Sequence, residues 1–571
     1  MLTAAQPRPR PRRVLSSMRV LLLAVIAIPA GQALSQPIVV SPQVRLSPGT
    51  EEWYECSVGV SQTNKDEVLI MAAPGPMRTA VVDWASGTAP VLSTATGNLD
   101  VFVTPHPTDG TIWYTSLDPN GPVTGWKSAG ATTIPSGQIG TFSGSELQDK
   151  PGLAIGPWPG SPSGYRHYIL RMQKNVGGGG CNHKHHEKVS YSDNADLGPG
   201  AWSWTEVPVE PDPNWPDPCH YLGWGAAPVV LDSGRIVAAI ADEWVSSSGT
   251  WKYNFGKPYI VFSDDGGVDW KSDDPDSPIQ IDPDNDVFPT TLNENCFNIC
   301  PNTGCNDQDP TGAPCSTCGD TPMQVDRRKG APSVAVDRTP EDPFLDHVYV
   351  AFYAKASENS SNTDLFIAKS FDGGATFDNN DLLHITDSML GLTPTDYNPD
   401  QMVPALSIDS CGGVNVMFYD NRNDTNPNDC EYWVDVYYAR ITNFDTTPSI
   451  SQWRLTPQSV RVDNLGSAFL GDYHNMTVSA DGQTLYAAYI SRNNANPTTG
   501  NRTCYLHRIN LNCTGPASDF TGDGEVTEAD LAAYLTEYSS GGMAADLDLD
   551  WVVDVNDFVT YIDWYNTEHG E

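Results

Sequence analysis

Short apolar runs separated by turns rich in Gly, Pro, Asp and Ser recur along the chain from about residue 45 to residue 510. The clearest copies pair a first apolar run with a second one a few residues later, as in 403–408 followed by 414–419. Such runs, bounded by turn signals, are typical of β-strands. The pattern therefore predicts an all-β body of six repeated units. Their first strands are expected at residues 57–61, 152–155, 227–231, 331–336, 403–408 and 476–479.

Two of the predicted hairpin turns share one pattern. Segments 263–270 and 370–377 both contain Ser, any residue, Asp, any residue, Gly, two residues and an aromatic residue. The Ser and Asp side chains can hydrogen-bond the backbone of the turn, and Gly267 and Gly374 can adopt a positive φ. These segments resemble the Asp-box (BNR) repeats of sialidase-like β-propellers. The resemblance implies a six-bladed sialidase-like β-propeller over residues 36–512, in which the Asp box is a structural fastener far from the functional face.

Blade geometry then sorts the loops by face. If the innermost strand starts at the top, the second strand ends at the top, and the turn between the third and fourth strands lies at the bottom. Residues just before first strands and just after second strands should therefore surround one channel mouth, either as a functional site or as an ordinary solvated rim. The polar residues at these places are Arg327, Arg328, Asp242, Glu243, Lys355, Asp420, Asn421, Arg422, Asp472, Tyr473, Ser491 and Arg492.

Two functions fit this face. The first is a glycan-recognition module. The second is a glycoside hydrolase of the sialidase-like superfamily acting on extracellular polysaccharide, with catalytic candidates Glu243, Asp420, Asp472 and Tyr473. A hydrolase needs a pair of carboxylates at a defined separation, and a binding module does not. A scaffold without a ligand is a third possibility.

The resemblance also implies what sialidase activity would require. Sialidases clamp the substrate carboxylate with three arginines, one of which precedes a first strand, because a planar guanidinium binds a carboxylate bidentately. At the corresponding places this chain has Ala226, Gly330 and Met402, none of which can play that role. Sialoside hydrolysis is therefore not expected, although candidate substrate-binding arginines remain on other blades. They are Arg328, Arg422 and Arg492.

Charge narrows the set of partners. The 571 residues include 32 Lys and Arg against 71 Asp and Glu, a formal net charge of −39. Such a polyanion repels nucleic acid and anionic lipid and attracts divalent cations, or its acidic groups solvate the surface in salty water. We expect no nucleic-acid partner.

The N-terminus predicts export. Arginines through Arg19 are followed by an apolar stretch over 20–30 and by small residues at 33–35, the order of a secretory signal peptide. Residues 1–35 are therefore expected to be removed, by the general or the twin-arginine route, which leaves the protein extracellular or associated with the cell surface. No later apolar run is long enough to span a bilayer.

The twelve cysteines fit an oxidising compartment. Cys411 and Cys430 flank one predicted hairpin, and Cys504 and Cys513 could close a short loop. Five more lie in an insertion at about 290–322, where the CxxC spacing of Cys315 and Cys318 leaves a zinc site as the alternative to disulfides.

The C-terminal residues 513–571 carry a duplicated calcium-loop pattern. Oxygen-bearing side chains stand at loop positions 1, 3, 5 and 12 from Asp519, and the pattern recurs 27 positions later from Asp546. Each loop runs into a predicted helix with apolar residues at i, i+3, i+4 and i+7, so the two helices should pack together. Trp551 replaces the Gly that eases the turn, so the second site is expected to be weaker.

This module resembles dockerin-like domains, and the resemblance implies a small α-helical calcium-binding domain with a cohesin-like or cell-surface docking partner. Calcium is the expected cofactor. The ligands carried onto this chain are Asp519, Thr521, Asp523, the carbonyl of Glu525, Asp530, Asp546, Asp548, Asp550, the carbonyl of Val552 and Asp557.

Overall fold

The structure is a computed structural model of the whole chain. It describes residues 39–41, 43–46, 53–73, 77–83, 91–95, 99–117, 123–128, 137–142, 148–173, 186–195, 199–207, 220–225, 227–245, 251–252, 258–271, 279–280, 332–338, 346–354, 363–377, 382–392, 399–424, 433–444, 447–462, 470–471, 473–492, 498, 501–511, 526–540, 545 and 553–569.

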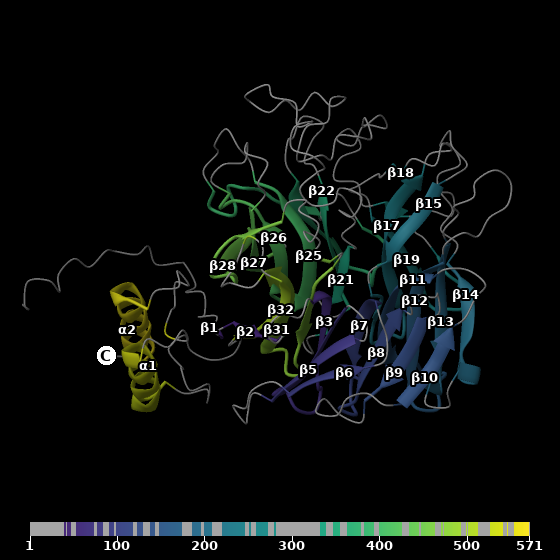
Figure 1. Cartoon of the computed structure of the whole chain (residues 1–571), viewed down its shortest axis with the longest axis horizontal. Helices are drawn as coiled ribbons and strands as arrows, with labels where there is room; N and C mark the ends of the chain where they lie inside the picture. The colour runs from purple at the N-terminus through teal and green to yellow at the C-terminus, as the bar shows by residue number, and fades with distance from the viewer. Residues whose placement is uncertain are drawn as a thin grey trace, which may run out of the picture.

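The strands of the described residues form seven antiparallel sheets that follow one another along the chain (Figure 1). In six of these sheets the main strands lie side by side in chain order, and in the seventh the N-terminal strands join the last three strands of the body, which is the arrangement of propeller blades. The first three blades are β3 (Tyr54–Val60), β4 (Glu67–Ala73), β5 (Met77–Asp83) and β6 (Val91–Ala95); β7 (Leu99–Pro105), β8 (Ile112–Leu117), β9 (Val123–Lys127) and β10 (Gly137–Phe142); and β11 (Gln148–Pro157), β12 (Tyr165–Gln173), β13 (His186–Ser192) and β14 (Ser203–Glu206), with a 3-10 turn at Pro199–Ala201.

The next blades carry additional short strands. Blade four has β15 (His220–Gly225), β16 (Val229–Val230), β17 (Ile236–Val245), β18 (Trp251–Lys252), β19 (Pro258–Ser263) and β20 (Ile279–Gln280); blade five has β21 (Ser333–Val336), β22 (Val348–Ala354), β23 (Asp364–Ser370) and β24 (Leu382–Ile385). Blade six has β25 (Gln401–Ile408), β26 (Val414–Asp420), β27 (Trp433–Thr442), β28 (Ser449–Arg454) and β29 (Val460–Arg461); blade seven has β30 (Asn475–Val478), β31 (Thr484–Arg492) and β32 (Arg502–Asn510).

The propeller therefore has seven blades, and the predicted number of six is wrong. All six predicted first strands are present, and the blade that the sequence pattern missed is β7 to β10. Its outer strands β9 and β10 contain Gly and Thr among their few aliphatic residues, and its core includes Trp113 and Tyr114. Because this blade is buried through large aromatic residues and contacts with its neighbours, its apolar periodicity is too weak to be recognised in the sequence.

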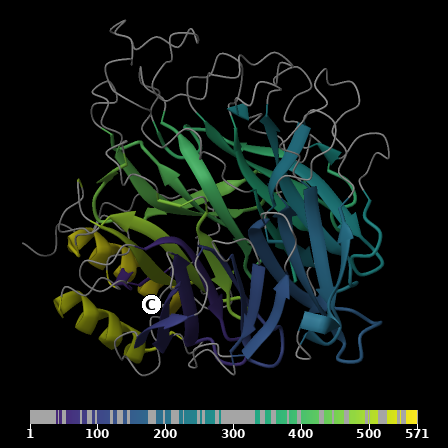
Figure 2. The ribbon, with the colours of Figure 1, turned by 45° about the vertical axis from the view of Figure 1, so that its right-hand side comes forward.

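The two ends of the propeller meet at blade seven. The N-terminal strands β1 (Val39–Val40) and β2 (Val44–Arg45) pair with β32, so they supply the outer strand of the last blade. The innermost strand β3 also contacts β31 and β32. Figure 2 shows the purple strands of the first blade next to the green and yellow strands of the last. The ring is thus closed by strands from both ends of the body.

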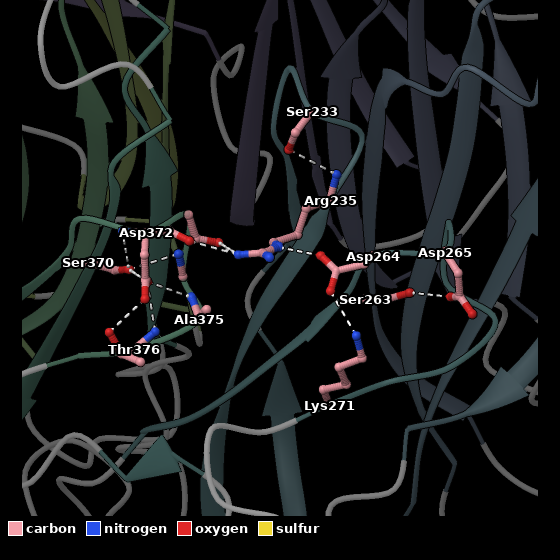
Figure 3. A network of polar contacts seen from close by, with 12 residues as sticks. Ser233, Arg235, Ser263, Asp264, Asp265, Lys271, Ser370, Asp372, Ala375 and Thr376 are labelled. Atoms are coloured by element: carbon pink, nitrogen blue, oxygen red, sulfur yellow. Dashed lines mark hydrogen bonds and ion pairs between the residues drawn. The ribbon is translucent and has the colours of Figure 1, made fainter.

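Both predicted Asp boxes lie in turns between the third and fourth strands of their blades (Figure 3). In blade five, Asp372 Oδ1 accepts bonds from Ser370 Oγ at 2.8 Å and from the backbone N–H of Ala375 and Thr376 at 3.0 and 2.8 Å. Asp265 does the same in blade four, and Gly267 and Gly374 have φ of +87° and +79°. The hairpin interpretation of this pattern is confirmed.

Arg235 joins the two boxes. Its guanidinium bonds Asp264 Oδ1 at 2.6 Å in its own blade and the carbonyl of Asp372 at 2.7 Å in the next (Figure 3). In blade three, Arg166 likewise reaches the carbonyl of Gly266 at 2.7 Å. The Asp boxes therefore receive an arginine from the preceding blade, which fastens neighbouring blades on this face.

The two C-terminal helices, α1 (Glu528–Ser540) and α2 (Val555–His569), pack against each other as predicted. Tyr534 and Tyr561 stack with ring centroids 3.8 Å apart, and both are almost fully buried. Within the described part of the chain, no helix has the length and apolar character needed to cross a membrane.

Candidate functional site

The upper face is defined here as the face at which the first strand of each blade begins. Asp420 and Arg492 end second strands, so they lie on this face, whereas Asp265 and Asp372 follow third strands on the opposite face. Antiparallel order within each blade imposes this separation. The predicted division of the two faces is confirmed for these residues.

Four of the first strands contain a β-bulge near their upper ends. Their pairing with the second strand shifts register at Glu55, at Asp100, at Lys150 and at Val403, and each of these residues has a positive φ, between 43° and 53°. A non-glycine residue in this region costs of order 1–3 kcal/mol, and such outliers cluster at functional sites. The bulges aim three charged side chains from adjacent blades at one another.

Glu55, Asp100 and Lys150 form a buried ion triad. The Nζ of Lys150 lies 3.1 Å from Glu55 Oε1 and 2.6 Å from Asp100 Oδ1. The three side chains are only 4–6% exposed. Because both oxygens bond one nitrogen, they lie at most about 6 Å apart, which includes the separation of about 5–5.5 Å used by retaining glycosidases. In this arrangement, however, the ammonium group occupies the space between the carboxylates.

Tyr473 completes this cluster from blade seven. Its ring stacks on Phe102 with centroids 4.5 Å apart and lies 5.3 Å from the Lys150 nitrogen. Its hydroxyl donates to the carbonyl of Val101 at 3.0 Å. The catalytic candidate Tyr473 is therefore held against the triad, and four blades (seven, one, two and three) contribute to this part of the upper face.

A second polar cluster lies on the upper ends of blades five and six. Asp420 is fully buried and pairs with Arg422 at 2.7 Å, while Gln401 donates to the same Asp420 oxygen at 3.2 Å. The Arg422 guanidinium also bonds Gln452 Oε1 at 2.8 Å and lies 3.9 Å from the centre of the Tyr437 ring. These contacts hold the candidate residues Asp420 and Arg422 in position.

Asp387 is the unusual member of this second cluster. Burial, followed by the neighbouring carboxylates of Asp364 and Asp420, raises the pKa of Asp387 to about 6. Its Oδ1 is buried without a hydrogen-bond partner, and so is Oε1 of Gln401, whose side chain also bonds Asp387. Asp364 in turn lies 2.6 Å from Nε2 of His384. A carboxyl group that titrates near neutral pH beside an Arg-paired carboxylate is an arrangement that can donate or accept a proton.

The other sequence candidates are distributed as follows. Glu243 lies in β17, where its backbone pairs with Tyr221. Arg492 is 2% exposed, and its Nε donates to the carbonyl of Arg461 at 2.6 Å. Arg327, Arg328, Lys355 and Asp472 lie outside the described residues.

Glu55, Asp100, Lys150 and Asp387 were missed by the sequence analysis. The first three fit the expectation that residues just before first strands lie on the functional face, because each stands just before the apolar part of a first strand. They were overlooked because two of these strands belong to weakly patterned early blades and one to the unrecognised blade.

The calcium ligands Asp519, Thr521, Asp523, Glu525, Asp546, Asp548, Asp550 and Val552 also lie outside the described residues. The two loop-ending residues are described. Asp530 and Asp557 are fully buried, and each accepts the backbone N–H of the residue three positions earlier at 2.8 Å. Among the described residues, no group of three or more His, Cys, Asp or Glu is arranged to hold a metal.

The structure settles part of the cysteine assignment. Cys411 is disulfide-bonded, and Cys430, its proposed partner, is outside the described residues. The possible bridge between Cys504 and Cys513 is not formed, because Cys504 is unbridged and its thiol donates to the carbonyl of Tyr505 at 3.8 Å.

The fold and these clusters define a β-propeller with an acidic, irregular upper face. No family model and no curated protein matches the chain. Solved structures similar to it include a Dyadobacter fermentans protein of unknown function (12% identity, TM-score 0.38, 83% of this chain and 99% of that one). Another is the α-L-arabinofuranosidase Arb93A of Fusarium graminearum, with 10% identity, a TM-score of 0.38, and coverage of 84% of this chain and 99% of that one. A third is a Trypanosoma rangeli sialidase, with 11% identity, a TM-score of 0.32, and coverage of 80% of this chain and 59% of that one. Because the sequence identities and TM-scores are this low, these similarities do not indicate which activity this protein has.

Proposed function

We propose that the upper face of this propeller recognises an extracellular glycan, and that the C-terminal module displays the propeller in a calcium-dependent manner. The observation that supports recognition is the ion triad of Glu55, Asp100 and Lys150, which three strained first strands hold in one place. Fixed, desolvated charges beside aromatic rings favour a hydroxyl-rich neutral or cationic ligand, and the net charge of −39 disfavours an anionic one.

The proposal for the C-terminal module is supported by the equivalent positions of its two halves. Asp530 and Asp557 stand 27 positions apart at the starts of α1 and α2, buried and with the same backbone contact. Two loops ending on equivalent carboxylates would each hold one calcium ion through the predicted ligands. With the predicted signal peptide, this favours a secreted protein that docks to a cohesin-like or cell-surface partner.

Glycoside hydrolysis is the second candidate function, and the raised pKa of Asp387 favours it. In that function Asp387 would be the general acid, beside the carboxylates of Asp364 and Asp420. The two candidates differ in whether a bound glycan is cleaved.

The test is a glycan array and a hydrolysis screen on the full secreted chain, with Asp387→Asn as the variant. Asp269→Asn in the Asp-box turn of the opposite face is the matched control. Recognition predicts binding without turnover, unchanged in the control variant. Hydrolysis predicts turnover that falls by about 10²-fold or more in Asp387→Asn, the usual contribution of a general acid. If no glycan binds and none is cleaved, both functions are refuted.

A further inference from the structure

Two buried cysteines from distant parts of the chain meet where the propeller closes. Cys56 lies in β3, the first strand of blade one, and Cys504 lies in β32, the third strand of blade seven. Both are 0% exposed. The two strands contact each other, both cysteines belong to one core cluster, and the Cys56 thiol lies close enough to raise the pKa of the Cys504 thiol.

The surroundings of this pair are apolar and tightly packed. Both cysteines belong to the largest core cluster, together with Tyr419 of blade six and Ile490 and Tyr505 of blade seven. Tyr419 donates its hydroxyl to the carbonyl of Ile490 at 2.7 Å, and the Tyr505 hydroxyl donates to the carbonyl of Arg492 at 3.3 Å.

We propose that Cys56 and Cys504 form a disulfide in the mature protein, which covalently joins the first blade to the last. The two thiols lose two protons and two electrons as the S–S bond forms. The electrons reduce a disulfide oxidant, either glutathione disulfide or a protein disulfide, to two thiols through a mixed-disulfide intermediate. The crosslink closes a loop of most of the propeller, which restricts the unfolded chain far more than a short loop would.

The crosslink has to form during folding. Burial, together with the neighbouring Cys56 thiol, raises the pKa of the Cys504 thiol well above its ordinary value, and the thiolate is the reactive form. A disulfide oxidant also cannot reach a pair that is 0% exposed. Oxidation must therefore precede the docking of blade seven against blade one, after which the packed core protects the bond.

The first experiment maps the bond in the full chain. Protein refolded with glutathione disulfide is alkylated under denaturing conditions without reductant, digested, and analysed by mass spectrometry. We expect a peptide containing Cys56 linked to one containing Cys504. Complete alkylation of both cysteines, or linkage of either to another cysteine, would overturn the proposal.

The second experiment measures the consequence, with Cys56→Ala, Cys504→Ala and the double variant. Because the packed core shields the bond in the folded protein, each protein is unfolded and refolded either with glutathione disulfide or with reductant. Refolding in reductant should lower the melting temperature of the wild-type protein by roughly 3 °C more than that of the double variant. Reduction of the Cys411 disulfide affects both proteins and therefore cancels. Each single variant should be about as stable as the double one, and an equal response of wild type and double variant to reductant refutes the crosslink.

Discussion

Replacement of Lys150 by Met is the sharpest test of the upper face. The variant keeps the length and apolar stem of the side chain but removes the ammonium group from between two carboxylates that are about 95% buried. Glu55 and Asp100 are then left in a desolvated site, at most about 6 Å apart, where they repel each other by about 3 kcal/mol at an effective dielectric constant of about 20.

Stranding a buried charge in this way typically costs about 3–5 kcal/mol. Lys65→Met is the matched control, because Lys65 pairs with Asp481 at 3.2 Å but the two side chains are 48% and 40% exposed. Loss of such a surface pair should cost about 0–1 kcal/mol. The two variants remove the same chemical group and differ in burial.

The assay is chemical denaturation monitored by tryptophan fluorescence, from which the midpoint and the slope of the unfolding transition are measured. The midpoint of Lys150→Met should fall well below those of wild type and Lys65→Met. The triple variant Lys150→Met/Glu55→Gln/Asp100→Asn should recover much of the loss, because it leaves no unpaired charge. Equal midpoints for the two lysine variants, or a triple variant no more stable than Lys150→Met, would refute the assignment of this energy to the triad.

Four further predictions concern other parts of the molecule. Burial lowers the pKa of His474 from 6.5 to about 4, so the unfolded chain binds the extra proton first, and stability should fall as the pH drops through this range. His474→Gln should flatten that fall in melting temperature, and an unchanged slope would contradict it. Calorimetric titration with calcium should report two sites, one of them lost in Asp523→Ala; no binding heat would refute the module. Asp372→Ala should destabilise by about 1–3 kcal/mol in urea, and more than Asp372→Asn, which keeps the accepting oxygen. Finally, a fluorogenic sialoside should not be turned over, and robust turnover abolished by Arg422→Ala would show that an arginine clamp assembles from other blades.

The sequence by itself determined the class of fold, the Asp-box turns and the pairing of the C-terminal helices. These features depend on local rules: apolar runs bounded by turns, side chains that bond their own turn, and a helical repeat of apolar residues. Asp265 and Asp372 could be placed because each makes its contacts within four residues.

Only the tertiary structure decided the number of blades, the closure of the ring and the content of the upper face. Blade two is stabilised by aromatic packing and by its neighbours, and β1 finds its partner β32 across almost the whole chain. Lys150 meets Glu55 because bulges on three blades turn their side chains toward one point, and Cys56 meets Cys504 because blade seven closes on blade one. Contacts between residues that lie far apart in sequence depend on how the blades pack, and no local pattern records that packing.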